Sequence, residues 1–164
     1  MIQRIQTLFL ALVAMALIAM VFYPVMDLTE FTTLPNETLE TDYYQLLITG
    51  LSDPSPDSVP QMNRYVFIPL TIILLMIIIL VIYSIFRFEQ RLHQLKLIKI
   101  CIFINIIMVA GIFLNYPKIF TDNPIRIEFG AGAYFPLISL VLLVVAYRYI
   151  TKDEKLVRSA NRLR

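Results

Sequence analysis

The chain has 164 residues and a net charge of +2; 59% of its residues are hydrophobic and 16% are charged. Its mean hydropathy is +0.74, whereas soluble domains are roughly 45–50% apolar and 25% charged. A soluble fold of this size could not cover that much apolar surface, because small domains have a high ratio of surface to volume. We therefore expect lipid to be the solvent for much of the chain.

Four long apolar runs follow one another along the chain: Thr7–Tyr23, Val66–Phe86, Ile98–Leu114 and Tyr134–Ile150. Each has the roughly 17–21 residues that a helix needs to cross a hydrocarbon core of ~30 Å. Backbone groups in lipid must satisfy their own hydrogen bonds, which leaves helices or a closed barrel. Ile72–Ile82 does not alternate as a barrel strand would. The sequence predicts an all-α membrane protein, a bundle of four transmembrane helices in a single domain.

The basic residues divide unevenly between the segments that flank these runs. Eleven of the 14 Lys and Arg residues lie in the N-terminus, around the loop 87–97 and after Tyr147. The positive-inside rule assigns such segments to the cytoplasm. Both termini, the loop 87–97 and the tail 151–164 are therefore expected inside, and the loops 24–65 and 115–133 outside.

The outer loops carry strand signals. Met26–Thr33 and Tyr43–Thr49 are rich in β-branched and aromatic residues, and Ile125–Phe129 alternates before a glycine-rich turn. We expect a small β-rich element of three strands on the extracytoplasmic side. Four helices with a β-rich first outer loop also give a claudin-like outline, an analogy of architecture that transfers no function.

Two polar residues inside the runs are candidate contacts. Asn105 lies near the middle of the third run and Ser139 lies in the fourth. Such residues either contact a ligand or form hydrogen bonds between helices. We favour helix packing, because no charged residue shares the bilayer interior with Asn105. Small residues predict close packing of the first, third and fourth helices, whereas the second has none between Val66 and Tyr83 and suits lipid.

Residues for catalysis or metal binding are scarce. The chain has one histidine, His93, and one cysteine, Cys101, which cannot by themselves form a zinc site or a catalytic triad. The interior of the predicted bundle has no carboxylate, which argues against proton-coupled transport. We expect no enzyme activity, no cofactor and no metal.

The tail 151–164 combines positive charge with an apolar stripe. Its candidate contact residues are Lys152, Lys155, Leu156, Arg158 and Leu163. One interpretation is an anchor on anionic headgroups at the cytoplasmic face. The other is a docking helix for a protein partner.

Three segments carry a resemblance to a known family. The opening Met1–Thr7, the stretch Gly132–Pro136 and the ending Asp153–Arg164 resemble an uncharacterised bacterial family, domain-of-unknown-function family four-two-nine-three. The resemblance covers essentially the whole chain. It implies a bacterial inner-membrane protein with four helices, and it brings no established activity or site residues.

Two functions fit these patterns. The first is a non-catalytic accessory or structural subunit of an inner-membrane protein complex, whose partners are membrane lipids and other membrane proteins, with no nucleic acid. The alternative is a lipid or small-solute carrier or channel with Asn105 near its site. A packed apolar interior would favour the subunit, and a continuous polar cavity would favour the carrier.

Overall fold

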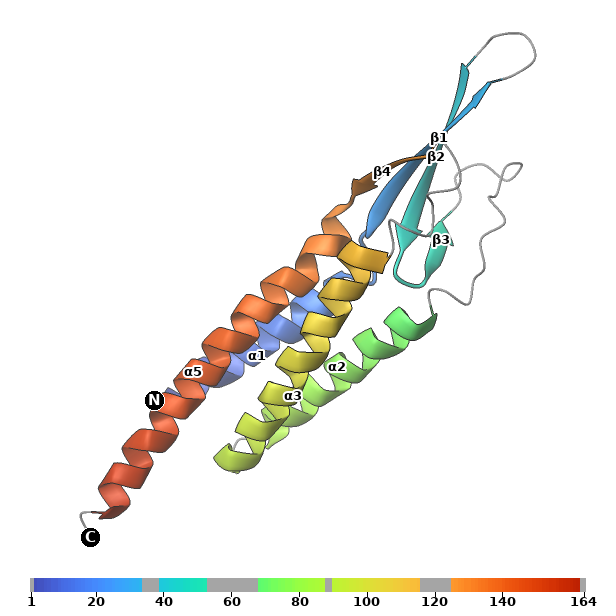
Figure 1. The fold of residues 1–164 in the computed structure, drawn as a ribbon. Coiled ribbons are helices and arrows are strands. Elements are labelled where there is room, and N and C mark those ends of the chain that lie inside the picture. The colour runs from blue at the N-terminus through green and yellow to red at the C-terminus, as the bar shows by residue number, and fades with distance from the viewer. Residues whose placement is uncertain (1, 34–38, 53–67, 88–89, 116–124, 163–164) are drawn as a thin grey trace.

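The computed structural model describes residues 2–33, 39–52, 68–87, 90–115 and 125–162. These residues form an elongated helical bundle that carries a small sheet at one end (Figure 1). The first two residues of the second apolar run, 66–67, lie outside the described residues.

Four long helices make up the bundle: α1 (Ile2–Ala19), α2 (Ile68–Phe86), α3 (Arg91–Ala110) and α5 (Phe135–Arg162). A wider π-helical turn, Gly111–Asn115, continues α3, and a short 3₁₀ turn, Ala131–Tyr134, leads into α5. Pro69 and Pro136 stand in the first turns of α2 and α5, where the missing backbone N–H removes no helical hydrogen bond. α5 has 28 residues and runs without a break from the fourth apolar run into the tail.

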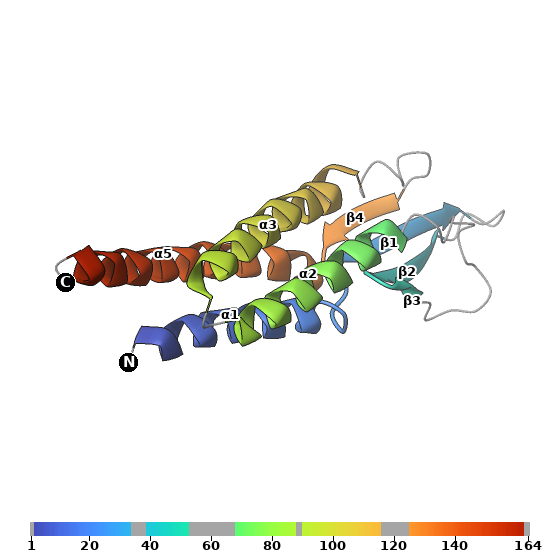
Figure 2. The ribbon, with the colours of Figure 1, turned by 90° about the horizontal axis from the view of Figure 1, so that it is seen from below.

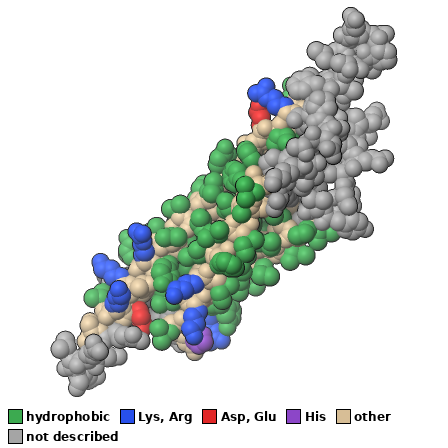
Figure 3. Space-filling model, viewed as in Figure 1, with side chains coloured by type: hydrophobic (Ala, Val, Ile, Leu, Met, Phe, Trp, Pro, Cys, Tyr) green, Lys and Arg blue, Asp and Glu red, His purple; other side chains and the backbone are tan. Residues whose placement is uncertain are grey.

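Within the part of the chain that the structure describes, three helical segments are long and apolar enough to cross a membrane: Ile68–Phe86, Leu92–Leu114 and Ala131–Val157. They correspond to the second, third and fourth apolar runs. The apolar part of α1, Ile5–Ala19, is shorter. Nevertheless, α1 runs antiparallel beside α5 within the same bundle (Figure 2). Hydrophobic side chains cover the middle of the bundle, and basic side chains gather toward the end opposite the sheet (Figure 3).

The sheet has four antiparallel strands in the order β3-β2-β1-β4. They are β1 (Met26–Thr33), β2 (Leu39–Leu47), β3 (Gly50–Ser52) and β4 (Ile125–Phe129). Sequence reasoning expected three strands and missed β3. β3 forms because Gly50 has φ 149°, a conformation that L side chains rarely adopt, and the chain reverses there to pair with the end of β2.

The register of the sheet places one apolar row against the bundle. Leu28 of β1 pairs with Tyr44 of β2 and with Ile127 of β4. Leu28 and Tyr44 are each 1% exposed, and Ile127 packs against the same core. The alternate residues, such as Arg126 and Glu128, are exposed and form an ion pair of 3.0 Å. This alternation is what a sheet with one covered face requires.

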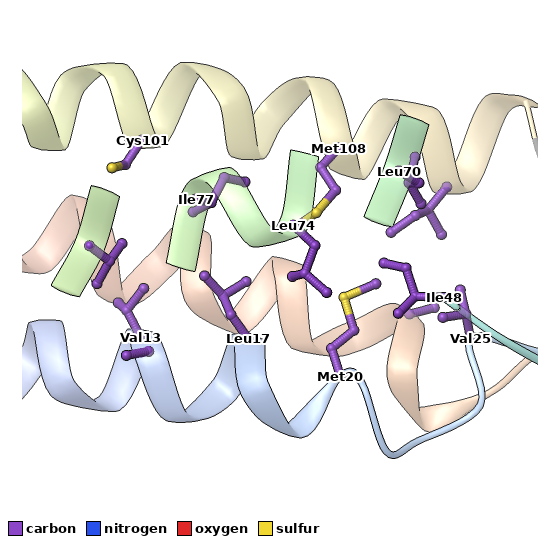
Figure 4. Packing of buried hydrophobic residues seen from close by; sticks show 14 of the residues in the cluster. Val13, Leu17, Met20, Val25, Ile48, Leu70, Leu74, Ile77, Cys101 and Met108 are labelled. Atoms are coloured by element: carbon purple, nitrogen blue, oxygen red, sulfur yellow. The ribbon is translucent and has the colours of Figure 1, made fainter. Parts of the chain in front are cut away.

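Apolar side chains from the helices fill the centre of the bundle (Figure 4). Val13 and Leu17 of α1 meet Leu74 and Ile77 of α2 and Met108 of α3, and each is at most 1% exposed. α5 packs against both α1 and α3, in keeping with the small residues on those helices. α2 is not left to lipid alone, since one face of it packs against α1 and α3. Branched aliphatic side chains fill such an interface as well as small ones do.

Candidate functional site

The polar pair at the centre of the bundle joins α3 to α5. Asn105 Nδ2 donates a hydrogen bond to Ser139 Oγ at 2.5 Å. The Ser139 hydroxyl in turn donates to the carbonyl oxygen of Pro136 at 2.8 Å. Both side chains are fully buried. The structure thus brings together the two polar residues that the sequence singled out, by a hydrogen bond of the type expected between helices in lipid.

The surroundings of this pair are apolar. Cys101 and Met108 lie about one turn to either side of Asn105 on α3, and both are fully buried. Ala146 lies two turns beyond Ser139 on α5 and is also buried. The amide oxygen of Asn105, Oδ1, has no hydrogen-bond partner among the described residues. Chemically, the pair offers one spare acceptor and no group that changes charge at physiological pH.

Backbone contacts join the sheet to one end of the bundle. The N–H of Gly132 donates to the carbonyl oxygen of Pro24 at 2.7 Å, and the N–H of Gly130 donates to that of Val25 at 3.0 Å. A Cβ atom at Gly130 or Gly132 would lie 2.4 or 2.5 Å from a backbone oxygen. Glycine is therefore needed at both positions so that this segment can approach the backbone at Tyr23 and Pro24. The sequence alone predicted only a turn here.

Side chains add to the same junction. Thr71 Oγ1 of α2 donates to the carbonyl oxygen of Ile48, in the turn between β2 and β3, at 2.7 Å. The ring centroids of Phe113, next to α3, and Phe129, at the end of β4, are 4.8 Å apart. α2 and the segments that adjoin α1, α3 and α5 all contribute to this junction, so the sheet is fixed to the bundle at several points.

The tail forms the last three turns of α5. Lys152, Lys155 and Leu156 are exposed on it. Arg158 belongs to the helix, although its side chain lies outside the described ones, and Leu163 lies outside the described residues. Leu156 and its neighbour Val157 are 51% and 40% exposed. The described part of the tail is therefore a helical arm with exposed cations and an exposed apolar pair.

No constellation for metal or acid–base chemistry is found within the described ranges. They hold no group of three or more His, Cys, Asp or Glu residues that could bind a metal ion. His93 lies exposed near the start of α3, and Cys101 is buried on the same helix. The candidate features that remain are the polar pair, the seated sheet and the helical arm.

The fold defines a class: a helical membrane protein with a small sheet seated on one end of its bundle. A family comparison is more specific, because the profile described as Domain of unknown function (DUF4293) matches residues 2–163. The chain belongs to this family. No curated protein matches its sequence.

Proposed function

We propose that the chain is a non-catalytic subunit, accessory or structural, of a protein complex in the bacterial inner membrane. The observation that carries this proposal is the packed apolar interior of the bundle. Leu17, Leu74, Ile77 and Met108 meet there, and the Asn105 amide is already hydrogen-bonded to a neighbouring helix. A bundle packed in this way suits a scaffold that presents surfaces at its two ends.

The proposal includes α1 as a fourth transmembrane helix, with both termini in the cytoplasm and the sheet outside. α1 has 18 residues, about 27 Å at a rise of about 1.5 Å per residue. Its outward side chains, including Leu8, Met15 and Ile18, are apolar and 42–58% exposed. The excess of basic residues at the end of the bundle opposite the sheet supports this orientation. Four spans below a β-rich outer element would also give the claudin-like outline.

Cysteine labelling tests this topology. Cysteines at Tyr43 in β2 and at Thr49 in the turn that follows, both exposed, should react with a membrane-impermeant thiol reagent in cells with a permeabilised outer envelope. Cysteines at His93 and Ser159, also exposed, should react only after lysis. The native Cys101 is buried, so background labelling should be low. A cysteine inserted after Met1 that reacts before lysis would exclude α1 as a fourth span.

The helical arm is the proposed docking surface for a protein partner. An anchor needs only positive charge near the headgroups, whereas a docking helix also needs its apolar residues in place. Shuffling residues 152–164 at constant composition separates these demands. We expect the shuffled protein to insert normally, because Arg148 and the loop 87–97 are unchanged, and to lose its partner when purified in mild detergent.

A matched control for the shuffle is Lys152→Arg/Lys155→Arg, which keeps both the charge and the apolar pattern. This variant should retain the partner. Normal partner recovery with the shuffled tail would exclude docking through the arm and would leave the sheet as the candidate surface.

A lipid or small-solute carrier is the second candidate. The spare acceptor Asn105 Oδ1, buried and without a partner in the described part of the chain, is the observation that favours it. If Asn105 served a ligand, Asn105→Leu would abolish function in the cell while leaving the abundance of the protein normal.

A further inference from the structure

Contacts of two tyrosine rings on α5 relate the depths of α1, α3 and α5 along the bundle. The rings of Phe9 on α1 and Tyr149 on α5 stack with their centroids 5.5 Å apart. Lys99 Nζ of α3 lies 5.6 Å from the ring centroid of Tyr147 on α5. Phe9, Lys99 and Tyr147 therefore mark nearly the same depth along the bundle.

On the α1 and α2 side, exposed apolar side chains continue beyond this depth as far as Phe86, which Arg87 follows. Ile5 and Leu8 on α1 are 46% and 56% exposed, and Phe86 at the end of α2 is 75% exposed. Gln94 Nε2 of α3 donates to the carbonyl oxygen of Ser84 at 3.1 Å. This hydrogen bond places the end of α2 at the same depth along the bundle as the first turn of α3. Both lie further from the sheet than Lys99.

On the α3 and α5 side, the surface at the same depth is basic. Lys99 on α3 and Arg148 on α5 are exposed. We call these two residues the basic face; Figure 3 shows Lys and Arg side chains over this part of α5 and α3. Within the described residues, neither of the two is paired with a carboxylate.

The depth of the basic face makes these charges unusual. The sheet begins just beyond the contact between Tyr23 and Phe135, whose ring centroids are 5.4 Å apart, so the outer edge of the hydrocarbon lies near that pair. Tyr147 is about 18 Å from Phe135 along α5. A hydrocarbon core of ~30 Å extends about 10 Å further. Lysine and arginine can reach water from there by extending their side chains, but an unneutralised charge at this depth remains costly.

We propose that the basic face binds the phosphate of an anionic phospholipid from the inner leaflet. A phosphodiester with a net negative charge would neutralise Lys99 and Arg148, and its acyl chains would lie on the apolar surface above them. The contact of Lys99 with Tyr147 holds the ammonium group against α5, beside the residue that precedes Arg148, and one headgroup would contact the cations of both helices. The inference rests on the proposed membrane arrangement and is independent of the docking arm.

Native mass spectrometry of the full chain in mild detergent tests this site. The protein is titrated with phosphatidylglycerol or with phosphatidylcholine of the same acyl chains. We expect the intact protein to bind phosphatidylglycerol at least about tenfold more tightly, a ratio typical of one or two headgroup contacts. Lys99→Gln/Arg148→Gln should abolish this preference and leave the binding of phosphatidylcholine unchanged.

Two further variants control for charge and folding. Arg87→Gln/Arg126→Gln removes two exposed cations elsewhere and should keep the preference. Lys99→Arg/Arg148→Lys keeps the charge and should also keep it. Thermal unfolding in the same detergent checks that each variant is folded.

Several outcomes would overturn the proposal. They are equal binding of both lipids by the intact protein, a preserved preference in Lys99→Gln/Arg148→Gln, and displacement of the lipid by millimolar inorganic phosphate. Loss of a protein partner by that variant with unchanged lipid preference would instead assign the face to a protein contact. Because lipid binding is measured without a partner, its failure is distinguishable from failure of docking through α5.

Discussion

The two ends of the bundle are built in different ways. At the end that carries the sheet, backbone contacts backbone, since Gly130 and Gly132 donate directly to carbonyl oxygens of Val25 and Pro24. At the other end, α2 and α3 are joined by a side-chain hydrogen bond from Gln94, and the last turns of α5 carry exposed residues such as Leu156. Backbone contacts leave no room for a larger side chain. Side-chain contacts and an exposed helix end can instead rearrange when a partner binds. The end that carries the sheet is therefore expected to be fixed by folding, and the opposite end to be free for binding.

The largest effect is expected at the junction between the sheet and the bundle. Gly132→Ala places a Cβ 2.5 Å from the carbonyl oxygen of Tyr23, and we expect it to lower the free energy of unfolding by about 3 kcal/mol, as severe overpacking does. Gly111→Ala is the matched control, because its Cβ would meet only the side-chain end of Leu70, at 3.1 Å. The control should stay within about 1 kcal/mol of the original protein. Thermal unfolding in detergent measures both, and equal effects would contradict a backbone-locked junction.

The polar pair between α3 and α5 should show an intermediate effect that depends on which partner is removed. Ser139→Ala leaves the buried amide of Asn105 without its acceptor and is expected to cost about 2 kcal/mol. Asn105→Leu removes the amide altogether and should cost no more than about 1 kcal/mol. Unfolding of the two variants in one detergent gives the comparison. A larger loss for Asn105→Leu would show that Asn105 has contacts other than Ser139.

The smallest effect on stability is expected at the tip of α5. Truncation after Val157 removes the part of the helical arm furthest from the sheet. Because Leu156 and Val157 before the cut and Ser159 after it are exposed, we expect the free energy of unfolding to change by less than about 0.5 kcal/mol, as for exposed sites generally. A clearly lower unfolding temperature would mean that the arm folds back on the bundle and would weaken its assignment as a docking surface.

Local patterns predicted much of this architecture. The second, third and fourth apolar runs became helices of spanning length, and the alternation in Ile125–Phe129 became β4. The sequence predicted β2 only in part: the strand begins at Leu39, whereas the prediction began at Tyr43. The start of that strand was missed because its pairing with β1 matters more than the composition of the segment itself.

The sequence by itself determined the class of the protein, the positions of most of its helices and the division of its basic residues. These features follow from composition and from the length of apolar runs, which are local properties of the chain. Only the tertiary structure decided that Asn105 meets Ser139 and that Gly132 approaches Pro24. It also decided that Lys99 of α3 lies at nearly the same depth in the bundle as apolar Leu8 of α1. Each of these relations joins residues far apart in sequence, and it arises from how the helices pack against one another, which no local pattern specifies.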